Sequence, residues 1–213
     1  VEALTAMETD STRVLSIIAD DIFDAQVNGR FRLSQLPTTF ANATFSRFKF
    51  YEKRPTTDDQ SYTYSLKVTA PNVKIINTPL LFDGKTQIEG SINTTPPRSV
   101  MDVVAERINY QNVLIDTLSM HLDTDSKNTL TFTAQKLINP LYSMQDFKLI
   151  SYRENDSLYV DADFKKWNSS TDVFFDLHSY VYEDSLHNVV FGLLPSEVHL
   201  EKNTWNIGGQ DRD

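Results

Sequence analysis

The chain has 213 residues, of which 40% are hydrophobic and 23% are charged, a composition typical of a globular protein. Acidic residues outnumber basic ones by 29 to 20, for a formal net charge of −9, and the basic residues are scattered. This disfavours nucleic acid and anionic membrane surfaces as main partners, because binding to phosphate needs a positive patch. The absence of cysteine excludes disulfides, thiolate nucleophiles and Cys-based zinc sites.

Strict alternation of apolar and polar residues is the first signal along the chain. From Phe23 through Val27 and Phe31 to Leu33, every second residue is apolar or glycine, and the residues between them are polar. A period of two places the two sets on opposite faces of a strand. The segment 23–33 therefore predicts a strand with one apolar and one solvated face.

The segment 36–50 breaks the alternation and predicts a single amphipathic helix. Ala41, Phe45 and Phe48 follow at i, i+4 and i+7, which is helical spacing, and Pro37 suits a first helical turn. After this helix, alternation returns in runs separated by turn residues such as Asp83-Gly84 and Asn155-Asp156. The further predicted strands lie at 63–69, 87–92, 116–122, 129–134, 147–149, 158–164, 173–181 and 189–193.

The runs after the helix have no helical segment between them, which predicts antiparallel pairing through hairpins. An internal repeat supports this prediction, because 112–134 matches 141–162, with Leu130 aligned to Leu158 and Ala134 to Ala162. Such a hairpin unit cannot bury its apolar face alone and needs stacked neighbours. About eleven strands spaced roughly 4.8 Å apart would give a segment on the order of 50 Å long.

Residues with catalytic or ligand-binding spacing are not evident. The sequence has no G-x-S-x-G, P-loop or G-x-G-x-x-G motif, and its histidines lack metal-ligand spacing. His121 and His178 fall on the polar side of their predicted strands, where solvated strand residues are the simplest interpretation. We therefore expect no catalytic residues, no metal site and no cofactor.

The alternating strand that leads into a short helix, FDAQVNGRFRLSQLPTTFANATF at 23–45, resembles the TamB/AsmA-like proteins of Gram-negative envelopes. The repeated hairpins at 109–137, 155–167 and 198–207 resemble the same family. The segment 100–207 carries most of this resemblance, which rests on the pattern of strands more than on invariant residues.

The resemblance implies a long periplasmic protein that is anchored in the inner membrane and engages an Omp85/TamA-type outer-membrane barrel. It implies an elongated antiparallel sheet curled into a half-closed, β-taco-like groove that conducts phospholipids between the two membranes and supports outer-membrane protein assembly. Under this reading, residues 1–213 form a single elongated β domain that is a fragment of a longer protein. Its membrane anchor and barrel-binding end would lie outside the fragment.

Phospholipid acyl chains are the partner that such a groove would hold, and no enzymatic activity is expected. The groove-lining residues would be those on the apolar side of each strand, namely Leu118, Met120, Leu130, Phe132, Phe147, Leu149, Leu158, Val160, Phe164, Val173, Phe175 and Leu177. The same alternation also fits a compact β-sandwich used for adhesion or interaction without lipid, because a second sheet would cover the apolar face equally well. A third reading is an enzyme with an unrecognised site.

Overall fold

The computed structural model describes residues 3–8, 12–45, 51–56, 59–74, 78–125, 127–166 and 173–208. Nearly all of the regular structure is β-strand. The strands form a single 16-stranded sheet whose main path runs β1-β2-β3-β4-β7-β8-β9-β10-β11-β12-β13-β15-β16, with β5, β6 and β14 paired beside it. Every pairing is antiparallel, as the absence of helical segments between the predicted strands indicates.

The strands follow one another along the chain with a single helical interruption after β3. Their bounds are β1 Ala3–Glu8, β2 Arg13–Ala19, β3 Phe23–Arg30, β4 Ser61–Val68, β5 Val73–Lys74, β6 Leu80–Phe82, β7 Thr86–Thr94, β8 Pro97–Tyr110, β9 Val113–Asp123, β10 Thr129–Ile138, β11 Ser143–Glu154, β12 Ser157–Lys166, β13 Val173–Glu183, β14 Val189–Leu193, β15 Ser196–Leu200 and β16 Asn203–Ile207. The interruption contains a 3-10 turn, Leu33–Gln35, and the helix α1, Leu36–Phe45.

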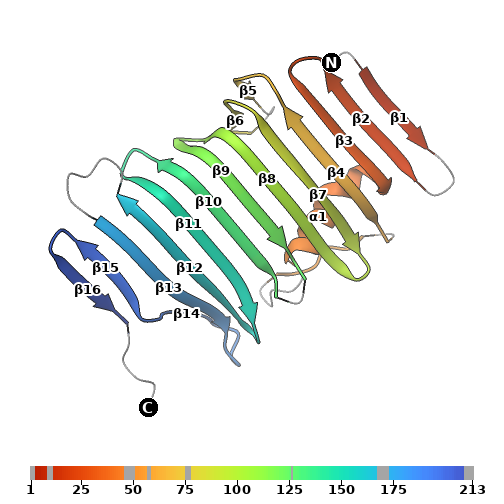
Figure 1. Ribbon diagram of the computed structural model, residues 1–213. Coiled ribbons are helices and arrows are strands. Elements are labelled where there is room, and N and C mark those ends of the chain that lie inside the picture. Colours follow the sequence, from red (N-terminus) through yellow and green to blue (C-terminus); the bar gives the residue numbers. More distant parts are fainter. Residues whose placement is uncertain are drawn as a thin grey trace.

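Figure 1 shows these strands side by side in one twisted, curled sheet that does not close, with β1 and β16 at its opposite edges. The predicted elongated antiparallel sheet is therefore confirmed. A spacing of about 4.8 Å between strands gives the main path a width of roughly 58 Å. The described residues form one sheet and not the two packed sheets of the alternative β-sandwich, so that architecture is wrong for this part of the chain.

The longest strand, β8, was not predicted from the sequence because its apolar residues do not alternate. Ala105 and Ile108 are both buried although they are three positions apart. The pairing with β9 runs from Ala105 directly to Arg107, and Thr117 opposite this gap has a positive φ of 53°. The register is the same on both sides of this unpaired position, but the parity of the inward-facing residues changes across it.

The helix α1 confirms the predicted element over 36–45, and the remaining predicted residues, 46–50, lie outside the described part of the chain. Its predicted apolar side is wrong. Phe45 is exposed, whereas the buried helix residues are Thr39, Asn42, Ala43 and Thr44. Thr39 and Asn42 occupy this buried side because they are hydrogen-bonded to other parts of the fold, which hydropathy alone does not reveal.

Two local predictions have different outcomes. The internal repeat is confirmed as two hairpins, β9–β10 and β11–β12, joined by turns near 124–128 and 155–156. The predicted strand 23–33 ends earlier than expected. Phe31 is buried, but Leu33 lies in the 3-10 turn and is 60% exposed, so it does not continue the apolar side of β3.

Candidate functional site: the apolar face of the sheet

Directly paired residues of neighbouring strands share one face of a sheet, so the strand register defines continuous cross-strand rows. One row contains only apolar side chains from β1 to β13, and we call it the middle row. It runs Leu4, Ile17, Ala25, Leu66, Ile88, Val103, Met120, Phe132, Leu149, Ala162, Leu177. The sheet therefore has a single apolar face that extends across most of its width.

A second row lies beside the middle row and ends in aromatic residues, so we call it the aromatic row. It begins Ala19, Phe23, Val68, Thr86, Ala105, Leu118, Ala134, Phe147 and resumes on the next strands as Phe164, Phe175, Val198, Trp205. The rings of Phe147 and Phe164 join the two stretches, with centroids 5.9 Å apart.

The twelve residues predicted to line a groove all lie on this apolar face. Leu118, Phe147, Phe164 and Phe175 belong to the aromatic row, and Met120, Phe132, Leu149 and Leu177 belong to the middle row. Leu130, Leu158, Val160 and Val173 have the same parity on their own strands. Leu118 is nevertheless only 6% exposed, which makes it a core residue rather than part of an open surface.

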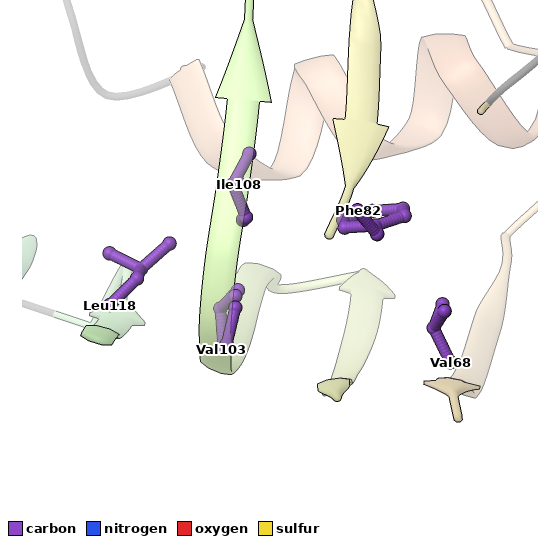
Figure 2. Close-up of a cluster of buried hydrophobic side chains, with 6 residues drawn as sticks. Val68, Phe82, Val103, Ile108 and Leu118 are labelled. Atoms are coloured by element: carbon purple, nitrogen blue, oxygen red, sulfur yellow. The ribbon is translucent and has the colours of Figure 1, made fainter. Parts of the chain in front are cut away.

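Over β3 to β9 the apolar face is covered by the chain itself, and we call this region the covered part. The β5–β6 hairpin brings Phe82 against β8, where it packs with Val68, Val103, Ile108 and Leu118. Figure 2 shows these side chains gathered together, with α1 passing behind them. Phe82 and Val68 are each 1% exposed, so this end of the apolar face belongs to a buried hydrophobic core.

The helix α1 covers the other end of the same region. Its Ala43 packs with Phe31, Tyr62 and Ile92, and these four residues are 1% to 6% exposed. Phe40 adds an edge-to-face contact with Tyr64, at a centroid distance of 6.4 Å. Burial in this cluster raises the pKa of both Tyr62 and Tyr64 above that of a free phenol, because the charged form would be poorly solvated there.

Over β10 to β15 the apolar face has no such cover, and we call this region the open part. No described helix or second sheet packs on these strands. Phe164 stacks on Phe175 with ring centroids 4.6 Å apart, and Phe132 meets Phe147 edge-to-face at 5.7 Å. The side chains of this aromatic series are half-buried rather than enclosed.

Large apolar side chains at the rim of the open part are more exposed still. Phe191 of β14 is 63% exposed and is paired with Val181, and Trp205 of β16 is 60% exposed and is paired with Val198. A contiguous apolar surface of this kind is unusual on a monomeric globular protein and marks an interaction site. The open part is therefore the candidate functional site.

The opposite face of the sheet is polar and carries paired charges. His121 lies 2.7 Å from Asp102, and His178 lies 2.7 Å from Asp161 and 3.0 Å from Asp176. The hydrogen bond with Asp161 and the negative charge of Asp176 raise the pKa of His178. The two histidines lie on the polar side of their strands, as predicted, and a ring nitrogen of each is hydrogen-bonded to an aspartate on a neighbouring strand.

Tyrosines also gather on this polar face, where Tyr152, Tyr159 and Tyr180 are directly opposite one another. Tyr152 and Tyr159 stack with a centroid distance of 5.3 Å, which is the sheet pairing expected of them.

Among the described residues, no group of three or more histidines or carboxylates is arranged to hold a metal ion.

Sequence reasoning missed the division of the apolar face into a covered and an open part. Alternation identifies which side of a strand is apolar but carries no information about what packs on it. The one available signal was the concentration of aromatic residues between 31 and 82, including Phe31, Phe40, Tyr62 and Phe82, next to the only predicted helix.

Comparison with known proteins identifies no relative: no protein-family model, curated protein or solved structure matches the chain. Within the described ranges, no helix has both the length and the apolar character needed to cross a membrane.

Proposed function

We propose that this chain is a segment of a TamB/AsmA-like lipid-transfer protein of the periplasm, in which the apolar face of the sheet holds phospholipid acyl chains. In this proposal the full-length protein is anchored in the inner membrane and contacts an Omp85/TamA-type barrel through parts outside this chain. It conducts phospholipids between the membranes, supports outer-membrane protein assembly and performs no catalysis.

The observation that carries the proposal is the open part of the apolar face. A sheet with one apolar face must cover that face with another layer, by closing on itself or with a ligand. The described residues supply no layer over β10–β15, and the sheet is not closed. Of the three ways to cover the apolar face, a ligand remains, and an apolar, elongated ligand would suit this surface.

Acyl chains suit this surface because they need burial and not specific contacts. Removing apolar area from water contributes roughly 25 cal/mol per Å², whatever the detailed geometry. The inward side chains of the open part are mostly aliphatic or aromatic, and the polar exceptions are Ser151, Ser179, Ser196 and, at the end of β11, Arg153. A surface of this kind would let a hydrocarbon tail shift along the rows without breaking hydrogen bonds.

Photocrosslinking in cells tests the proposal. A benzophenone amino acid is placed at apolar-face positions of the full-length protein, and matched variants carry it on the polar face of the same strands. The apolar-face set is Phe132, Leu149, Phe164 and Phe175, and the polar-face set is Thr131, Lys148, Lys165 and Asp176. We expect lipid adducts from the first set alone. Equal labelling of both sets contradicts the proposal, and adducts with a protein in place of lipid would favour an interaction module.

A charge in the open part tests transport itself. Phe164→Asp places a carboxylate between Phe147 and Phe175, where an apolar chain would have to pass. Lys165→Asp on the opposite face of the same strand is the control. If folded Phe164→Asp in the full-length protein supports a normal outer membrane, the lipid path does not cross this strand.

A further inference from the structure

We propose that α1 and the β5–β6 hairpin form a fixed stop, which restricts acyl chains to the open part of the apolar face. This inference rests on the proposed function and adds an end point to it: the lipid path of the full-length protein begins or ends at the open part and does not continue over β3 to β9. The stop is the set of residues that covers β3 to β9, with Phe82 at one end of these strands and α1 at the other.

The first support is the change in exposure along a single row. In the aromatic row, Val68, Thr86 and Ala105 are at most 2% exposed, and Leu118 and Ala134 follow at 6% and 3%. Beyond Ala134 the row continues as three half-buried phenylalanines, then Val198, which is 7% exposed, and it ends at Trp205, which is 60% exposed. The aromatic row is thus buried from Val68 to Ala134 of β10 and becomes accessible at Phe147 of β11.

The second support is that hydrogen bonds hold α1 at both ends. Near its start, the Gln60 amide donates to the Gln35 side chain at 2.8 Å, and Gln60 is 1% exposed. Near its last turn, the Thr124 hydroxyl donates to the Ala43 carbonyl at 3.2 Å. These bonds connect the helix region to β4 and to the end of β9, so displacing α1 would break bonds at two separate points of the sheet.

Two polar side chains of α1, Thr39 and Asn42, also hold the helix between these points. Thr39 and Tyr62 share a hydrogen bond of 3.0 Å inside the protein. Asn42 donates to the Arg54 carbonyl at 2.8 Å and accepts from the Arg54 amide at 3.1 Å and from the Tyr51 hydroxyl at 3.0 Å. Buried groups satisfied in this way are costly to separate, which is the property of a fixed element rather than of a lid.

The size of the open part agrees with this boundary. From β10 through β15 the main path has five strands, and four spacings of about 4.8 Å give a stretch of roughly 19 Å. The hydrocarbon core of a bilayer is about 30 Å thick, so one leaflet contributes acyl chains about 15 Å long. The open part can therefore accept a single acyl chain laid along a cross-strand row.

Paramagnetic broadening of methyl signals tests the stop in the unmodified chain. The protein is labelled at its Ile, Leu and Val methyls and mixed with a phospholipid that carries a nitroxide on its acyl chain. Signals close to the nitroxide lose intensity. We expect this loss at Leu149, Val160 and Leu177 of the open part, and unchanged signals at Leu66 and Ile88 of the covered part.

Methyls on the polar face separate failure of the stop from failure of the proposed function. Ile150 and the 61%-exposed Val104 face away from the apolar side and serve as controls. Equal loss in the open and covered parts, with the controls unchanged, overturns the stop and leaves lipid binding intact. No loss anywhere, or equal loss at the controls, overturns the proposed function itself.

Discussion

Truncation of Phe82 is the sharpest test of how the apolar face is packed. This ring is 1% exposed and lies against Val68 of β4 and Ile108 of β8, so Phe82→Ala leaves a cavity that the rigid strands cannot close. Substitutions of buried phenylalanine by alanine cost about 3–5 kcal/mol. A loss of this size is a large part of the about 5–15 kcal/mol that stabilises a typical domain.

Phe191→Ala is the matched control, because it removes the same side chain from a position that is 63% exposed. We expect it to change stability by no more than about 0.5 kcal/mol. Urea unfolding reports the global difference through a shift of the midpoint at constant slope. Amide hydrogen exchange shows which strands lose stability in Phe82→Ala. Because each strand in this sheet contacts mainly its neighbours, faster exchange should appear in β4, β6 and β8 but not in β12. If the two variants lose equal stability, the β5–β6 hairpin does not form part of a packed core.

Two further substitutions test electrostatics and close packing elsewhere in the sheet. Burial and a hydrogen bond with Asp176 raise the pKa of Asp163 above 3.8, so the parent chain should lose stability as the pH rises through that raised value. Asp163→Asn should remove this loss and make the protein more stable than the parent at pH 7, by up to about 1 kcal/mol. Urea unfolding at several pH values measures the difference. A variant that is less stable than the parent at pH 7 contradicts this prediction. A Cβ added at Gly90 would lie within 3.0 Å of the Val100 carbonyl oxygen and the Tyr64 phenol. Gly90→Ala should therefore lower stability by about 1–3 kcal/mol in the same assay, and an unchanged midpoint contradicts the close packing.

The sequence predicted those parts of the fold that depend on the pleat alone. Alternation identified the apolar side of most strands after β3, and the repeat identified the hairpins β9–β10 and β11–β12. In each case the signal is local, because side chains point to alternate faces wherever the backbone is regular. The groove-lining residues were placed on one face for the same reason.

The missed features depend on non-local packing or on irregular backbone. The apolar residues of β8 do not alternate, because Val104 is exposed on the polar side and the parity of the buried positions changes between Ala105 and Ile108, so the strand went unrecognised. The buried side of α1 contains Thr39 and Asn42, whose partners lie on distant segments. Tertiary contacts decide which strands α1 and the β5–β6 hairpin cover, and the alternation of apolar and polar residues does not predict those contacts.

The length of α1 explains why part of the apolar face stays open. A helix of 10 residues is about 15 Å long, which spans only three or so strand spacings of about 4.8 Å. Together with the short β5–β6 hairpin it covers the strands around β8, whereas the main path is roughly 58 Å wide. Because the covering elements precede β7 in the chain and are tied to β4 and β9, they cannot reach β12 or β13 without leaving their buried contacts. The apolar side of β10–β15 must therefore be shielded from water by something other than the described part of this chain, and the methyl and crosslinking experiments identify whether that is lipid.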